Sequence, residues 1–188
     1  MSFHWNSHYN LKDKHAILGA SNYHWLNYDE NRLRDAYGRM KMKERGTRMH
    51  ALAAEHIELR IKMPDNDISF NRYVNDAIAF RMDPEVILYW SDFCFGTADA
   101  ISFRKNKLRI HDLKTGAVPA SMRQLEIYAA IFCLEYDVDV NDIDIELRIY
   151  QNDKIRIHKP EIDEIVPIMD RIITCSKLLD EWENGYHE

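Results

Sequence analysis

Two acidic side chains that could bind a metal ion fall within one short, β-rich stretch of the chain. Residues 99–103 and 107–113 alternate in polarity, and the polar residues 104–106 between them predict the turn of a β-hairpin. Asp99 lies where the first strand is expected to start, and Asp112 lies where the second ends. We therefore expect both carboxylates at the same end of the hairpin.

Paired carboxylates with a nearby lysine suit metal-assisted hydrolysis. A divalent cation such as Mg²⁺ relieves the repulsion between the carboxylates and keeps positions open for water and a phosphate oxygen. Lys114 follows Asp112 by two residues, so strand alternation points both side chains to one face. Its ammonium group could orient or help to deprotonate a water, or neutralise charge that grows on phosphorus. We predict that Asp99, Asp112 and Lys114 are catalytic.

Four motifs around this hairpin resemble those of the PD-(D/E)XK nuclease superfamily, in its RecB-like and phage-type exonuclease branch. In chain order they are Gly46-x-x-x-His50, Gly96-x-x-Asp99, Asp112-x-Lys114 and Gln124-x-x-x-Tyr128. An acidic-x-Lys triplet alone has almost no specificity, whereas four motifs in the right order are a strong signal. The alternative is a surface hairpin with an exposed ion pair of little energetic value. That alternative would make His50, Gln124 and Tyr128 coincidences.

The resemblance implies a restriction-endonuclease-like α/β fold, in which helices flank a mixed central sheet. It assigns metal binding to His50, Asp99, Asp112 and the backbone carbonyl of Leu113. One or two Mg²⁺ or Mn²⁺ ions would bind there, and imidazole is a softer ligand than Mg²⁺ prefers, so Mn²⁺ should serve at least as well. Gln124 and Tyr128, at i and i+4 on one helix face, would hold a phosphate or the catalytic lysine. Without the resemblance, an ordinary surface pair is the simpler interpretation.

The implied activity is metal-dependent hydrolysis of DNA phosphodiester bonds with 5′-phosphate products. By analogy with phage recombination nucleases, we expect an exonuclease that acts at DNA ends in recombination, repair or phage DNA processing. Two alternatives stay open. One is a catalytically silent nucleic-acid-binding or interaction module on the nuclease fold. The other is a nuclease subunit of a recombination complex, with a single-strand-binding or annealing protein as its partner. The sequence indicates no oligomeric state.

We expect no iron–sulfur cluster. In the iron–sulfur members of this branch, one cysteine follows soon after a serine that heads the opening helix, and three more lie near the C-terminus. Here Asn27 and Tyr28 occupy the first position, and Cys175 stands alone in the second. With Cys94 and Cys133 it makes three scattered cysteines, which form no zinc or disulfide pattern. Such cysteine usage favours a reducing cytoplasm.

Length and composition predict one nuclease domain over residues 1–188, with 1–14 as a candidate flexible arm. The chain has 188 residues, of which 46% are hydrophobic, enough for one proper core. A net charge of −6 argues against a generally basic nucleic-acid coat, but bound metal ions invert the local field. No signal-peptide pattern or membrane-length apolar run appears, which favours a soluble protein with no membrane partner.

The composition of residues 30–63 favours helix, with a break considered near Gly46. The stretch concentrates basic residues, namely Arg32, Arg34, Arg39, Lys41, Lys43, Arg45 and Arg48. Such runs are usually a solvated helical face. Beside a metal site, contact with the DNA backbone is about as plausible, because phosphates attract basic stripes without regard to sequence. We assign substrate binding to Arg48, together with Gln124 and Tyr128.

Other residues are given structural roles. Glu85 could be a further metal ligand, but its distance from Gly96 favours an exposed carboxylate at a strand end. We interpret His111 as a structural residue on the opposite strand face from Asp112. Residues 142–150 predict a strand with one solvated face, and residues 161–184 predict an amphipathic helix whose apolar stripe packs on the core.

Overall fold

A computed structural model describes residues 16–185, so the candidate arm at 1–14 lies outside the described residues. The chain divides into two compact units, Met1–Arg45 and Gly46–Glu188. A single domain over the whole chain stays a prediction. Among the described residues, no helix has the length and apolar composition needed to cross a membrane.

The described part of the first unit, residues 16–45, contains a 3₁₀-helix and the first part of a long α-helix whose later residues belong to the second unit. The 3₁₀-helix η2 (Ala20–Asn27) is followed by α1 (Glu30–Glu58), which starts where Asp29 Oδ1 accepts a hydrogen bond from Arg32 N at 2.8 Å. Helix α1 runs through Gly46 without interruption, so the break considered there is wrong. A single glycine lowers helix propensity but does not end a helix on its own.

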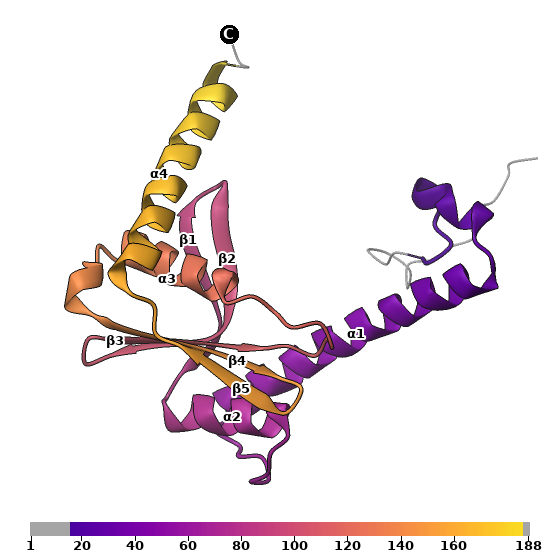
Figure 1. The fold of residues 1–188 in the computed structure, drawn as a ribbon, viewed down its shortest axis with the longest axis horizontal. Coiled ribbons are helices and arrows are strands. Elements are labelled where there is room, and N and C mark those ends of the chain that lie inside the picture. Colours follow the sequence, from indigo (N-terminus) through magenta and orange to yellow (C-terminus); the bar gives the residue numbers. More distant parts are fainter. Residues whose placement is uncertain (1–15, 186–188) are drawn as a thin grey trace, which may run out of the picture. The chain divides into compact units, whose positions relative to one another are not determined.

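The second unit is built on a five-stranded sheet. Its strands lie in chain order and are β1 (Asp83–Ser91), β2 (Cys94–Arg104), β3 (Lys107–Leu113), β4 (Asp144–Gln151) and β5 (Lys154–His158). All neighbours pair antiparallel except β3 and β4, which are parallel. The predicted class, an α/β fold with a mixed sheet flanked by helices, is confirmed at this level (Figure 1).

The predicted hairpin is formed by β2 and β3. Lys105 and Asn106 have φ of 52° and 55° in its turn, the left-handed conformation that tight hairpin turns favour. Strand β2 begins at Cys94, because its first residues continue the pairing with β1. Asp99 therefore lies inside the strand and not at its start as predicted.

Helices cover both faces of the sheet (Figure 1). Helices α3 (Arg123–Glu135) and α4 (Ile162–Gly185) enclose one core, which includes Leu108, Ile110, Leu125, Leu147 and Ile165. The end of α1 and helix α2 (Ser69–Ala79) enclose the other, which includes Ile57, Tyr73, Val74, Leu113 and Tyr150. Helix α3 is the crossover that a parallel β3–β4 pair requires.

Two sequence predictions for the C-terminal half need correction. Strand β4 has no solvated face: the side chains of Glu146 and Arg148 are only 8% and 15% exposed, because β4 is an internal strand covered on both faces. The apolar stripe of α4 packs only in part. Ile165 and Ile172 are buried, whereas other residues of the stripe, including Trp182, are exposed.

Candidate functional site

Three acidic residues lie in one row across strands β1, β2 and β3. The pairs Pro84↔Ala100 and Val86↔Ala98 place Glu85 opposite Asp99. The register of β2 and β3, in which Ala100 faces His111, places Asp112 on the other side of Asp99. Directly opposed residues in an antiparallel pair project to the same side of the sheet. We call Glu85, Asp99 and Asp112 the acid row.

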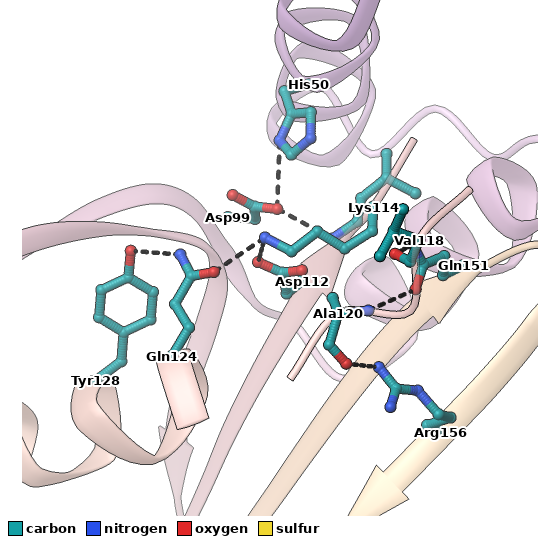
Figure 2. A network of polar contacts seen from close by, with 11 residues as sticks. His50, Asp99, Asp112, Lys114, Val118, Ala120, Gln124, Tyr128, Gln151 and Arg156 are labelled. Atoms are coloured by element: carbon teal, nitrogen blue, oxygen red, sulfur yellow. Dashed lines mark hydrogen bonds and ion pairs between the residues drawn. The ribbon is translucent and has the colours of Figure 1, made fainter. Parts of the chain in front are cut away.

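His50 joins the acid row from α1. Its Nδ1 lies 3.2 Å from Asp99 Oδ2, and that same oxygen accepts a hydrogen bond from the backbone N–H of Leu113 at 2.9 Å (Figure 2). His50, Glu85 and Asp99 can each offer one ligand atom such that these atoms all lie within 4.8 Å of one another. This is the spacing of groups that can share one cation.

Asp112 is the buried member of the acid row, and its carboxylate is only half satisfied. Its Oδ1 accepts a hydrogen bond from Lys114 Nζ at 2.8 Å. Its Oδ2 is buried and has no hydrogen-bond partner. An unsatisfied buried carboxylate oxygen is costly, which makes this atom an available metal ligand.

The ammonium group of Lys114 connects Asp112 to helix α3. Besides Asp112, it donates to Gln124 Oε1 at 3.0 Å, and Gln124 Nε2 in turn donates to Tyr128 OH at 3.1 Å (Figure 2). The i, i+2 pair on the strand and the i, i+4 pair on the helix therefore meet in one chain of hydrogen bonds. Gln124 is thus a second acceptor for the ammonium group, besides the carboxylate of Asp112.

Two of the motifs also fit together by shape. A Cβ atom at Gly96 would lie 2.8 Å from Cε1 of Tyr128, which is closer than side chains approach. The tyrosine ring thus packs against the backbone of β2 at a place where only glycine leaves room. Similarly, a Cβ at Gly46 would lie 3.0 Å from Thr115 Oγ1, so α1 passes close to the end of the lysine strand.

The pKa shifts in the site arise from burial and from an excess of negative charge. Burial and the neighbouring Asp99 raise the pKa of Asp112, and the same two causes raise the pKa of Glu85. The hydrogen bond to Asp99 raises the pKa of His50 above its ordinary value. Each shift favours an added proton, and a bound cation would relieve the same excess charge.

The residues present fit a hard divalent cation. Carboxylate oxygens are the preferred ligands of Mg²⁺ and Mn²⁺, and the group of His50, Glu85 and Asp99 supplies them beside one imidazole. Asp112, a predicted ligand, lies outside that group, and its unpaired buried Oδ2 is a separate candidate ligand. The backbone of Leu113 lies against Asp99 through its N–H, and the metal-binding role of its carbonyl stays a prediction. Arg48 is exposed on α1 and is not part of the hydrogen-bonded chain.

Glu85 is exposed near the start of β1, as predicted. Its carboxylate also belongs to the group with His50 and Asp99, the ligand role that sequence analysis considered but did not favour. It also has φ of 51°, which is unusual for a glutamate inside a strand. The register of β1 on β2 brings it opposite Asp99, and a bulge between Tyr89 and Ser91 shifts that register in a way that local sequence does not predict.

Another group of possible ligands joins α3, β5 and α4, and ion pairs account for it. His158 Nε2 lies 3.2 Å from Glu164 Oε1 and 3.7 Å from Glu126 Oε1. The buried Glu126 is also paired with Arg123 at 2.9 Å. Because its charge is already balanced, we do not interpret this group as a metal site.

Comparison of the chain with protein-family models found no matching family, and comparison with curated proteins found no match either. Function is therefore inferred from the residues of the site and their geometry.

Proposed function

We propose that this chain is a metal-dependent deoxyribonuclease of the PD-(D/E)XK superfamily with a restriction-endonuclease-like core. We propose further that it is an exonuclease of DNA recombination, repair or phage DNA processing. One observation carries the proposal. The Lys114 ammonium group is held between Asp112 and Gln124, beside a row of three carboxylates.

The acid row and His50 would hold one or two Mg²⁺ or Mn²⁺ ions. When bound, such ions polarise the phosphate, lower the pKa of a water and stabilise the leaving oxygen. The carboxylates of Asp99 and Asp112 would fix the position of the positive charge that the bound ions bring. Without a bound cation, the negative charges of these two carboxylates would repel each other.

Lys114 would act on the water and on the phosphate oxygens. Its three N–H groups can satisfy Asp112, Gln124 and one further acceptor at the same time, and the structure uses the first two. The third can orient an attacking water or neutralise charge that develops on the phosphate in the transition state. Gln124, bonded to Tyr128, keeps the ammonium group from rotating away.

DNA is the substrate that this chemistry favours. The basic residues of α1 that include Arg48 are exposed and could contact phosphates without reading sequence. The net charge of −6 restricts such contacts to a local patch. The annealing or single-strand-binding partner remains part of the proposal that the chain works in recombination.

The test incubates the protein with end-labelled linear, closed circular and single-stranded DNA, in Mg²⁺, Mn²⁺ or EDTA. We expect metal-dependent loss of linear but not circular DNA and no loss with Lys114→Ala. Lys177→Ala is the matched control, because Lys177 is an exposed lysine on α4 and should leave activity unchanged.

Other outcomes separate the alternatives. Cleavage of closed circles would replace the exonuclease by an endonuclease. DNA binding without cleavage under any metal would overturn the proposed activity and favour the silent binding module. Equal cleavage by the wild type and by Lys114→Ala would show that the nuclease activity does not come from this site.

A further inference from the structure

The loop between β3 and α3 is held by one buried glutamine. Gln151, the last residue of β4, donates through Nε2 to the carbonyls of Gly116 at 2.6 Å and Val118 at 2.7 Å. Its Oε1 accepts from the backbone N–H of Ala120 at 3.0 Å (Figure 2). The side chain therefore satisfies three backbone groups of one short loop while it is only 7% exposed as a residue.

Two further side chains of the β4–β5 hairpin hold the same loop. Asn152 Nδ2 donates to the carbonyl of Ala117 at 3.2 Å, and Arg156 donates to the carbonyl of Ala120. Together with Gln151, they bond the backbone of every residue from 116 to 120 except Pro119. Polar bonds to a backbone from a packed strand restrict its motion, so the loop is ordered before anything binds.

This ordered loop presents apolar side chains to solvent. Val118 is 83% exposed, the largest fraction among the exposed large hydrophobic residues between 16 and 185, and Ala117 and Pro119 beside it are exposed as well. A single exposed valine on a mobile loop would need no explanation. Here the backbone of Val118 is fixed by a buried side chain from another strand, which holds its apolar surface in one place.

The loop belongs to the candidate site at both of its ends. It starts directly after Lys114 and leads into α3, where Gln124 accepts the hydrogen bond of that lysine. Thr115, at its base, lies against Gly46 on α1, four residues from His50. A DNA strand whose phosphate met Lys114 would therefore pass the loop.

We propose that residues 116–120 form a preorganised contact for a nucleobase next to the phosphate that is cleaved. In this proposal, which rests on the proposed function, Val118 packs on the base and Gln151 is a positioning residue. Phosphates attract the ammonium group of Lys114, whereas an apolar side chain such as that of Val118 has no favourable interaction with them. Every nucleobase has a face of low polarity, so the contact would not depend on sequence.

The test compares oligonucleotides that are intact or abasic at single positions around the cleaved bond. At one position, the wild type should show a KM about tenfold lower for the intact strand, the value expected from burying most of one valine side chain. Val118→Ser should raise KM for the intact strand to that of the abasic strand, with kcat unchanged. Val166→Ser, an equivalent change at an exposed valine of α4, should keep the wild-type ratio.

Gln151→Met tests the positioning role, because methionine keeps the length of the side chain but makes none of its three hydrogen bonds. We expect it to lose the same discrimination between intact and abasic strands and to speed hydrogen exchange at the Ala120 amide. A purely structural role would lower stability without changing the ratio of the two KM values. If Gln151→Met does not fold, the result for Val118→Ser is sufficient to test the proposed contact.

The inference is overturned if Val118→Ser keeps the wild-type ratio at every position while the wild type is active. If the wild type binds DNA but does not cleave it, the proposed function fails. In that case, the ratio of the Kd values for intact and abasic strands, measured by fluorescence anisotropy, tests the contact with the base separately. If no oligonucleotide binds, both fail.

Discussion

Two polar clusters lie in the same sheet and differ in how their charges are balanced. The acid row brings three carboxylates together with one lysine and one histidine. The second cluster, which we call the arginine cluster, comprises Lys107, Arg109, Glu146, Arg148 and Asp76. Glu146 lies 2.9 Å from Arg148, 3.2 Å from Lys107 and 3.5 Å from Arg109.

The arginine cluster is an ion-paired network in which the buried Nε of Arg109 lies 3.5 Å from Glu146 Oε1 but lacks a hydrogen-bond partner. Arg148 bonds to Asp76 at 3.0 Å, and Tyr150 OH donates to the same carboxylate at 2.6 Å. The guanidinium groups of Arg109 and Arg148 lie over the ring of Phe80. All of its members are thus paired or stacked.

The pKa values of the two clusters shift in opposite directions. Burial raises the pKa of Asp112, and Asp99 adds to the rise. Burial would also raise the pKa of Glu146, but Arg148 and Lys107 outweigh it and hold the pKa below its ordinary value. The cations of the arginine cluster offset its buried carboxylate, whereas the acid row keeps an excess of negative charge. This difference supports the proposal that the acid row, and not the arginine cluster, binds a cation.

The largest expected effect is a loss of activity, without a loss of stability, on a change in the acid row. Asp112→Asn should lower kcat by on the order of 10³-fold or more, because it removes a ligand charge and the partner of Lys114. The same change should leave the melting temperature in EDTA unchanged or higher, because it relieves repulsion with Asp99. Cleavage assays and thermal unfolding measure the two. A large loss of stability would show that Asp112 is structural.

The arginine cluster should respond in the opposite way. Glu146→Gln should lower the free energy of unfolding by about 2–4 kcal/mol, because it leaves three buried or half-buried cations without their shared carboxylate. Activity of the remaining folded protein should be unchanged. Urea unfolding measures the loss, with the exposed Glu183→Gln as the control that should change little. A marginal effect would mean that solvent already screens the cluster.

The pH dependence of stability should carry opposite signs for these two acids. A raised folded-state pKa means that Asp112 contributes most below its ordinary value of 3.8, and the contribution is lost as pH rises through the folded pKa. A lowered pKa means that Glu146 contributes above its ordinary 4.5, and that contribution is lost as pH falls.

Thermal unfolding in EDTA between about pH 3 and 6 tests these signs. The stability of Asp112→Asn relative to the wild type should rise with pH, and that of Glu146→Gln should fall. Slopes of the same sign for both variants would contradict the comparison.

The smallest effect is expected at the far end of the lysine's hydrogen-bond chain. Tyr128→Phe removes the acceptor of Gln124 Nε2 but leaves the bond between Gln124 and Lys114. We expect kcat/KM to fall about two- to fivefold, equivalent to roughly 0.5–1 kcal/mol for one exposed hydrogen bond. Steady-state kinetics measure it, and a loss as large as that of Asp112→Asn would make Tyr128 itself a catalytic residue.

Local patterns predicted the parts of the site that lie close in sequence. The hairpin follows from strand alternation and its polar turn, and the contact of Asp112 with Lys114 follows from i, i+2 geometry. Gln124 and Tyr128 share a helix face for an equally local reason. The bond from Lys114 to Gln124 joins two such local units and could be anticipated only through the family resemblance.

Strand register and long-range packing decided what the sequence did not predict. Glu85 reaches the site through the β1–β2 hairpin, whose bulge between Tyr89 and Ser91 sets the register, and Gln151 through the long-range pairing of β3 with β4. The alternating acids of β4 looked solvent-facing, yet Glu146 is buried because Lys107, Arg109 and Arg148 surround it. The polarity of the residues alone does not distinguish a solvent-exposed strand face from a buried network of ion pairs.

The parallel pairing of β3 with β4 also dictates when the site can form during synthesis. The backbone N–H of Lys114 donates to the carbonyl of Tyr150 at 2.9 Å, and Gln151 holds the loop that follows the lysine. A nascent chain that has not yet released these residues from the ribosome contains both aspartates and the lysine but cannot hold them in place. Such non-local pairs form late in folding. The proposed activity would therefore begin only after Tyr150 and Gln151 have left the ribosome.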